Sequence, residues 1–304
     1  MSSTPIPSNF YDTKYLAEYY DLWTASHLPP VDLHSDAPTY LTALREALQD
    51  RPSSPFTILD IGTGTGRVLI NLANDAVSHR LDVSHITLLG VDKESAMIDR
   101  AKAVQTQTPA FRNFRSVAWS TGEAASISTL PMLAPHLGQI DLLLFAVGSI
   151  SHLTGPDEPA EFFTQVAQLL RPGSGRAYIP IQADLIVSES ADTQDGFTLR
   201  GDTWAEVREA ETFSSQLYEG VVYKQFPVHS SRVEGAVKYD KYEFEVVKSA
   251  EGEERVIERN QIEISLRIWQ RGKLLEWARQ AGLECVRTFE SSHEEYFVFK
   301  RLED

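Results

Sequence analysis

At 304 residues, the chain has room for one large α/β domain or for a core domain with a sizeable elaboration. Its 42% hydrophobic and 23% charged content is ordinary for a globular protein, so a filled core is expected and wholesale disorder is excluded. A formal net charge of -15 would repel a phosphate backbone, and no run of Lys and Arg offsets it. Nucleic acids are therefore not expected among the partners.

The single cysteine, Cys285, leaves no partner for a disulfide within the chain and no thiolate cage for a metal. The eight histidines form no HxxxH or carboxylate cluster, so no metal site is expected. Residues 1–5 lack the basic start and apolar run of a signal peptide, and no apolar stretch approaches the ~20 residues that cross a bilayer. These observations favour a cytoplasmic protein.

Residues 1–53 form the first of several zones and are expected to be helical. Aromatic side chains recur near helical spacing from Phe10 to Trp23, and two prolines at 29 and 30 interrupt the pattern. A second helix is expected over Thr39–Leu48.

Residues 54–182 alternate short β-rich runs with helical segments. This alternation predicts a parallel sheet with right-handed crossovers. The expected strands are Phe56–Asp60, Ile86–Asp92, Phe114–Ser120, Ile140–Ala146 and Arg176–Ile181, and the expected helices are Arg67–Ala76, Ala96–Ala103 and Pro159–Leu170.

Residues 183–265 change in character, because polar and apolar side chains alternate with the period of two that is typical of β-ribbons. An acidic turn at 251–254 would join two of these ribbons as a hairpin. We expect this insert to roof the substrate site and to offer a surface for a homodimer. The expected ribbons are Phe197–Arg200, Glu206–Ser214, Gly220–Phe226, Tyr239–Val247 and Val256–Ser265.

Residues 266–304 are expected to return to the α/β core. A helix over Gly272–Gln280 would stop at Gly282, which is a suitable C-terminal residue for a helix end. The strands Glu284–Phe289 and Glu295–Arg301 would then close the sheet as an antiparallel pair.

The most informative segment is an apolar strand that ends in Asp60 and runs into alternating glycines, Gly62, Gly64 and Gly66, before an amphipathic helix. Glycine allows a tight turn and lets backbone N–H groups approach a ligand. In the dinucleotide turn GxGxxG, the third glycine would stand where this chain has Arg67. The loop therefore suits a ligand without a pyrophosphate, and Asp60 beside it suits a cationic amino group.

Two further acids follow the next strands. Asp92 ends the second strand, where a carboxylate can accept hydrogen bonds from both hydroxyls of a ribose. After the third strand, Gly122, Glu123 and Ala124 provide an acid for an adenine amine and a small side chain against its ring. The step between the first two acids spans 32 residues, so residues 79–86 are expected to form an extended loop.

Together these features resemble the class I S-adenosylmethionine-dependent methyltransferases over roughly residues 10–182. The resemblance implies a doubly wound, mostly parallel seven-stranded sheet with an antiparallel β-rich insert and an N-terminal helical lid. It also implies S-adenosylmethionine as the cofactor. The residues implied in its binding are Tyr11, Tyr20, Asp60, Gly62, Gly64, Gly66, Asp92, Lys93, Met97, Gly122, Glu123, Ala124, Ala146 and Val147.

Plainer roles stay open for several of these residues. Asp60 could cap the following helix, and Asp92 could be the N-cap of the helix from Ser95 to Lys102. Met97 could be an ordinary core side chain, and Tyr20 could pack the lid without touching the cofactor.

The fourth strand continues into Ser149-Ile150-Ser151-His152-Leu153, beyond the carboxyl ends of the strands, where ligands of open parallel sheets bind. It lacks the Asn/Asp-Pro-Pro-Tyr sequence that marks methylation of planar amide or amino nitrogens in this superfamily. The stretch resembles the corresponding loop of the bacterial amino-sugar N,N-dimethyltransferases. Residues 11–23 resemble the Tyr-rich lid helix of the same family, and residues 262–283 resemble its C-terminal part. By position, this resemblance implies His152 and Tyr11 beside the accepting nitrogen.

Methyl transfer from a sulfonium is an in-line displacement, so alignment and desolvation provide most of the rate. An amine must also lose a proton, and a histidine with an ordinary pKa of ~6.5 suits that step. We therefore expect methylation of a small amine, with His152 as the base and Tyr11 orienting the donor.

Three alternatives remain. His152 could only shape the pocket through hydrogen bonds. The acceptor could be a hydroxyl or a thiol of a small metabolite. The protein could also bind the cofactor without methylating, as a cyclase-like catalyst or a scaffold.

Overall fold

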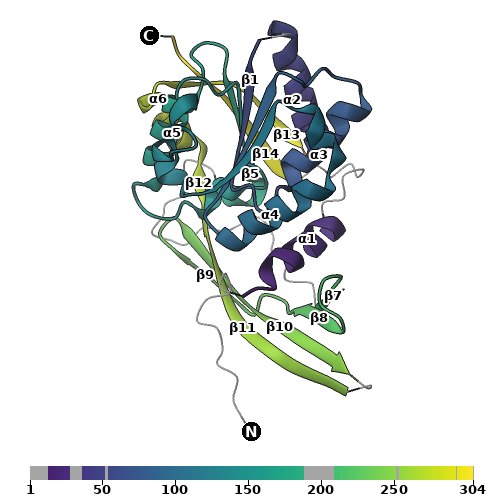
Figure 1. The fold of residues 1–304 in the computed structure, drawn as a ribbon. Coiled ribbons are helices and arrows are strands. Elements are labelled where there is room, and N and C mark those ends of the chain that lie inside the picture. Colours follow the sequence, from purple (N-terminus) through teal and green to yellow (C-terminus); the bar gives the residue numbers. More distant parts are fainter. Residues whose placement is uncertain are drawn as a thin grey trace.

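The computed structural model describes residues 13–27, 36–51, 54–187, 209–250, 253–291 and 293–303, which form an α/β core and a long β-rich extension (Figure 1). The core holds a seven-stranded sheet in the order β13-β14-β5-β4-β1-β2-β3, parallel except for β14, which runs antiparallel to both of its neighbours. The doubly wound sheet expected from the sequence is thereby confirmed. Its strands are β1 (Phe56–Ile61), β2 (Ile86–Asp92), β3 (Ser116–Thr121), β4 (Leu142–Leu144), β5 (Arg176–Gln182), β13 (Leu283–Ser291) and β14 (Glu294–Arg301).

Helices cover both faces of this sheet. One face packs on α2 and α3 through side chains such as Leu44 and Leu72, and the other packs on α5 and α6 through Phe162 and Leu274. Because the central strands are covered on both sides, β1 is buried along its whole length. The helices are α1 (Leu16–His27), α2 (Ala37–Asp50), α3 (Arg67–Ser78), α4 (Ser95–Gln107), α5 (Glu158–Leu169) and α6 (Arg271–Gln280).

Short turns of 3-10 helix fill the connections of the core. The loop expected at residues 79–86 is present between α3 and β2, and the link from β3 to β4 is built from two such turns. Those described are η2 (Pro109–Asn113), η3 (Ala124–Thr129), η4 (Ala134–His136), η5 (Ser149–His152) and η6 (Ala183–Leu185).

Two strands of the core sheet begin later than the sequence predicted. β3 begins at Ser116 and not at Phe114, because Phe114 follows the turn of η2 and buries its ring in the core. β4 covers only Leu142–Leu144, since Ile140 makes an isolated bridge to Leu170 and the chain bends away after Phe145.

The insert forms a second, antiparallel sheet in the order β11-β10-β8-β7, with β9 paired to β10. The expected hairpin is confirmed as the long β10–β11 ribbon, which points away from the core (Figure 1). β9 was not predicted, and the ribbon expected at Phe197–Arg200 lies outside the described residues. The strands are β7 (Glu211–Ser214), β8 (Val221–Gln225), β9 (Ser230–Glu234), β10 (Val237–Ala250) and β11 (Glu253–Arg267).

The insert leaves and re-enters the core at one place. The two short strands β6 (Ile186–Val187) and β12 (Trp269–Gln270) pair in parallel, with Ile186 opposite Trp269. β6 follows β5, and β12 precedes α6. The points where the chain enters and leaves the insert therefore lie side by side.

Helix α1 lies between the core and the insert (Figure 1). Tyr19 of this helix and Tyr15, which directly precedes it, share an apolar cluster with Tyr223 and Phe244 of the insert and with Met97 of α4. The N-terminal lid expected from the resemblance is thus present as a helix that bridges both parts. No helix among the described residues is both long and apolar enough to cross a membrane.

Candidate active site

The glycine turn connects β1 to α3 in a conformation that favours glycine at each alternate position. Gly62, Gly64 and Gly66 have φ values of 62°, 56° and 87°. At Gly66 there is also no room for a side chain, because an added Cβ would approach Cη2 of Trp119 to 2.8 Å. The turn is therefore held open as bare backbone at the carboxyl end of β1, where ligands of parallel sheets bind.

Asp60 lies at the end of β1 with no exposed surface. Its Oδ2 accepts a hydrogen bond from Thr63 Oγ1 at 2.6 Å, while Oδ1 is buried without a partner among the described residues. Burial raises the pKa of Asp60 to about 7. A buried carboxylate oxygen without a donor fits the ammonium group of S-adenosylmethionine. The alternative that Asp60 caps the next helix is wrong, because Gly66 is the N-cap of α3.

Asp92 is fixed at the end of β2 by backbone donors. Its Oδ2 accepts from the Gly64 amide at 2.8 Å, and its Oδ1 accepts from the Glu94 amide at 2.9 Å. Burial raises the pKa of Asp92 against the effect of these two bonds. The alternative N-cap role is wrong, since α4 begins after Glu94. Asp92 instead joins the glycine turn to β2, which leaves its remaining lone pairs for a diol.

The predicted adenine side is assembled next to Asp92. The amide of Gly122 donates to the Asp92 carbonyl at 2.9 Å, and Glu123 and Ala124 begin η3. Met97 is 6% exposed and packs with the lid, which is the core role that the sequence left open for it.

A buried ion pair beside the turn was missed by the sequence analysis. The guanidinium of Arg67 donates to both carboxylate oxygens of Asp36 at 2.8 and 2.7 Å, at the start of α2. Arg67 also interacts with the Tyr20 phenol, and the Tyr20 ring would lie 3.2 Å from a Cβ on Gly64. The sequence feature that could have indicated this ion pair is Arg67 itself, which stands where a dinucleotide turn has its third glycine. This arrangement fixes the lid residue Tyr20 over the cofactor turn.

A strained backbone carries the chain from β4 into the loop that contains η5 and His152. Val147 has φ 54°, and Gly148 follows at φ 59°. A positive φ is rare for a β-branched residue, and such strain concentrates at functional sites. Ala146 is buried, and its carbonyl accepts from Ser149 Oγ at 2.6 Å. The two left-handed residues turn η5 toward the glycine turn, where Ser149 lies 3.4 Å from the position of a Cβ on Gly62.

His152 is the last residue of η5, and its neighbours on both sides are fixed. Trp269 Nε1 donates to Ser151 Oγ at 3.0 Å, and Arg267 Nε donates to the Leu153 carbonyl at 2.6 Å. The His152 ring stays accessible, yet the surrounding protein, and secondarily Lys93, lower its pKa below the ordinary value. A lowered pKa favours the neutral imidazole, which is the form that can accept a proton. Arg267 was not singled out by the sequence.

Of the predicted site residues, only Tyr11 lies outside the described part of the chain. The others gather at the carboxyl ends of β1, β2, β3 and β4, with Tyr20 above them on the lid. Lys93, which follows β2, is half exposed and close enough to influence His152 electrostatically.

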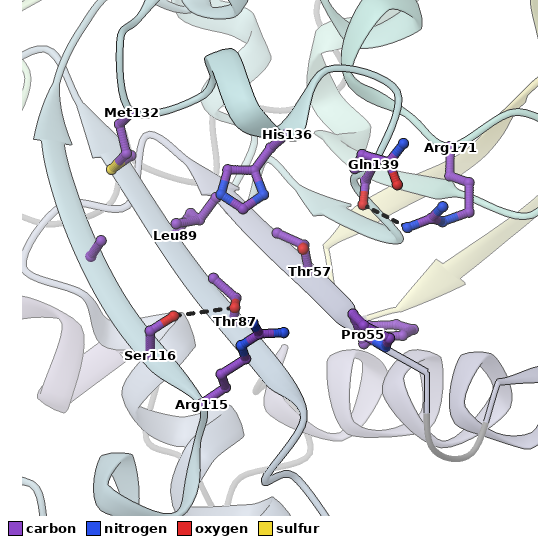
Figure 2. A pocket seen from close by; sticks show the side chains of 12 residues that line it. Pro55, Thr57, Thr87, Leu89, Arg115, Ser116, Met132, His136, Gln139 and Arg171 are labelled. Atoms are coloured by element: carbon purple, nitrogen blue, oxygen red, sulfur yellow. Dashed lines mark hydrogen bonds between the residues drawn. The ribbon is translucent and has the colours of Figure 1, made fainter.

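A hollow of about 460 Å³ lies near the amino ends of the strands, opposite the glycine turn (Figure 2). Thr57, Thr87 and Ser116, at the amino ends of β1, β2 and β3, form its floor, and His136 and Arg115 point toward it. Because it borders the amino ends of these strands, it is separate from the cofactor site. Within the described ranges, no three His, Cys, Asp or Glu side chains are grouped so that they could hold a metal ion.

Comparisons with known proteins agree with this geometry. The family described as "Methyltransferase domain" matches residues 59–175. N-methyltransferase FrzE of Cladobotryum sp is 32% identical over 285 residues, which are 92% of each chain. The chain belongs to the S-adenosylmethionine-dependent methyltransferases. The enzyme class and the cofactor predicted from the sequence are confirmed.

Solved structures extend the similarity of this methyltransferase to the whole fold. The sugar N-methyltransferase KedS8 of Streptoalloteichus sp has a TM-score of 0.62 at 20% identity, with 100% of this chain and 98% of that chain covered. An S-adenosylmethionine-dependent methyltransferase of Clostridium acetobutylicum has a TM-score of 0.61 at 12% identity, with 95% and 99% covered. The aminopentose methyltransferase CalS10 of Micromonospora echinaspora reaches 0.58 at 18% identity, with 97% and 99% covered.

Proposed function

We propose that this methyltransferase transfers a methyl group to an amine nitrogen of a small molecule. The observation that carries the proposal is the position of His152 at the end of the loop that faces the glycine turn, where its lowered pKa favours the neutral imidazole. The name of the relative FrzE and the sugar N-methyltransferase KedS8, which shares the fold, support an amine acceptor.

S-adenosylmethionine, when bound, supplies an electrophilic methyl group on its sulfonium. Asp60 and the glycine turn would hold the amino-acid end, and Asp92 would hold the ribose. His152 would accept the proton that the ammonium form of the acceptor must lose before its nitrogen can attack. Trp269 and Arg267 keep the loop that carries His152 in place, so the imidazole need not be reorganised during the reaction.

The detailed site assignment is part of the proposal. His152 and Tyr11 would be the catalytic pair, with Tyr11 orienting the donor. The cofactor contacts would come from Tyr11, Tyr20, Asp60, Gly62, Gly64, Gly66, Asp92, Lys93, Met97, Gly122, Glu123, Ala124, Ala146 and Val147.

The domain division, partners and location also remain proposals. We divide the chain into a lid at 1–53, a core at 54–182 and 266–304, and a substrate cap at 183–265. A homodimer, the absence of nucleic-acid partners and a cytoplasmic location are further predictions from the sequence. Methylation of oxygen or sulfur is the second candidate, because a neutral His152 would also accept a proton from a hydroxyl or thiol.

The test begins with calorimetric titration of S-adenosylmethionine and its demethylated product into wild type and Asp92→Ala. Micromolar binding that is lost in the variant would support the cofactor site. A screen of small amines, phenols and thiols for methylated product would follow, with His152→Ala beside wild type. Methylation of phenols or thiols alone would overturn the amine assignment, and full turnover of His152→Ala would overturn the base.

A further inference from the structure

The two faces of the insert sheet differ in the region nearest the core. On one face, Arg232 stacks on Tyr239 at 4.3 Å and pairs with Glu263 at 2.7 Å, so this face is an exposed charge network. The other face of β10 carries Lys238, Asp240 and Tyr242, because alternate residues of a strand share a face. It is this inner face that meets the lid and the core.

The inner face of β10 passes from the lid to the catalytic loop. Farther out, Phe244 packs on Tyr19 of α1 with ring centroids 4.7 Å apart. Toward the core, Leu266, which pairs with Lys238 on this face, packs against the apolar cluster that contains Ile150 and Leu153 on either side of His152. Asp240 pairs in register with Ile264, three residue pairs from Arg267, or about 10 Å along the ribbon. Asp240 therefore lies between the lid and the loop that carries His152.

Asp240 has an unfilled hydrogen-bonding position. Its Oδ2 lies 3.0 Å from Nζ of Lys238, whose side chain is 9% exposed. Its Oδ1 is buried and has no hydrogen-bond partner among the described residues. Farther out on the same face, Asn260 is 1% exposed, and neither its amide nitrogen nor its amide oxygen has a partner in the described chain. A buried polar atom without a partner is costly, so these atoms point to a ligand that supplies the missing bonds.

We propose that Asp240 is an acceptor-recognition residue that binds an O–H or N–H donor of the substrate, remote from the nitrogen that is methylated. The proposal rests on the proposed function of the His152 site. Lys238 fixes the carboxylate and offsets its charge, so Oδ1 can accept from a neutral hydroxyl or from a second ammonium group. A simple amine with only an apolar body would leave Oδ1 unpaired and would bind more weakly.

Binding, measured without turnover, tests the role of Asp240 separately from the reaction. The full chain is saturated with S-adenosylhomocysteine and titrated calorimetrically with hexylamine, aminohexanol and diaminohexane, which differ only at the far end of a six-carbon chain. In wild type, aminohexanol or diaminohexane should bind about tenfold tighter than hexylamine, and the tighter of the two identifies the donor. Asp240→Asn should reduce this preference to about twofold.

The matched control is Glu243→Gln, on the outer face of the same strand, which should keep the full preference. Equal affinities of the three probes in wild type, including no measurable binding of any, would overturn the role of Asp240. So would a preference that survives in Asp240→Asn. Failure to methylate any amine would instead count against the proposed function, since binding of the probes does not require methyl transfer.

Discussion

Glu18 of the lid helix accepts a hydrogen bond of 2.5 Å from the hydroxyl of Tyr223 in the insert. The same carboxylate also accepts from Ser215 Oγ and from the backbone amides of Gln216 and Leu217, at 2.7, 2.6 and 2.8 Å. One buried acid thus joins α1 to the turn between β7 and β8. The lid is thereby attached to the insert as well as to the core.

We predict that Glu18→Gln loosens the lid, because an amide nitrogen cannot accept the bonds that the carboxylate accepts. The loss should be about 1–3 kcal/mol in the free energy of unfolding, measured with urea at pH 7. Burial alone would raise the pKa of Glu18, but its four hydrogen bonds lower it overall. This stability is therefore present above the ordinary pKa of a glutamate and is lost as pH falls through the lowered value.

Only the wild type should lose this stability at low pH, so the free energies of unfolding of wild type and Glu18→Gln should converge there. Glu219→Gln, at an exposed position of the same turn, is the control and should match wild type. An equal loss of stability in both variants would contradict the role of Glu18.

Cofactor affinity should depend on the ionisation of Asp60. Because burial raises the pKa of Asp60 to about 7, the carboxylate is largely protonated at pH 6 and charged above neutrality. The ammonium of S-adenosylmethionine favours the charged form, so binding should tighten from pH 6 to 7.5 by up to about tenfold per pH unit. Calorimetry across this range checks the slope.

Asp60→Asn should bind more weakly and with little dependence on pH. The control is Glu294→Gln, because burial also raises the pKa of Glu294 to about 7 and it too is near Arg67. A slope that disappears in Glu294→Gln but persists in Asp60→Asn would assign the titration to Glu294 instead.

The pH profile of turnover should report His152. Since desolvation by the surrounding protein, and secondarily Lys93, lower its pKa, the base should stay active down to pH values below the ordinary histidine range and lose activity only below that. His152→Gln should reduce kcat by about 10²- to 10⁴-fold and remove this acid limb, with KM for the cofactor unchanged. His136→Gln, at the opposite edge of the sheet, serves as control. An acid limb that persists in His152→Gln would rule out His152 as its source.

Gly66→Ala should lose more stability than its φ of 87° alone explains, because the new methyl group would meet Trp119 at 2.8 Å. Gly235→Ala is a matched comparison, with φ 59° and no atom within 4 Å of its added Cβ. Both variants should lose about 1–2 kcal/mol from the left-handed backbone, and Gly66→Ala should lose about 1 kcal/mol more. Adding Trp119→Leu to Gly66→Ala should recover the excess. Equal losses in the two glycine variants would contradict the clash.

The parts of the site that follow a strand end could be predicted from the sequence. Asp60 and Asp92 each end an apolar run, Glu123 follows β3 by two residues, and parallel strands bring their carboxyl ends together without further information. The loop containing His152 follows the same rule. At these positions the local sequence pattern determines where the residue lies in the fold, because the parallel sheet places every strand end on the same side.

The contacts that could not be predicted join residues far apart in the chain. Asp36 and Arg67 are 31 residues apart, Glu18 and Gln216 are 198 apart, and Arg267 lies 114 from Leu153. Each of these charged residues would ordinarily be expected at the surface, because burial of a charge is favourable only with a specific partner. The partner becomes visible only once the fold places it, so residue type alone could not reveal these pairs.

The pairing of β6 with β12 places the entry and exit of the insert on adjacent strands, Ile186 opposite Trp269. A segment whose two ends meet in this way can be exchanged as a unit, because its two junctions with the core lie side by side. On the proposed role of the insert as the substrate cap, recombination at these two junctions would change the acceptor while retaining the same methyl-donor machinery. Chimeras joined at β6 and β12, with Arg267 retained to hold the catalytic loop, are the natural starting point for redirecting this methyltransferase.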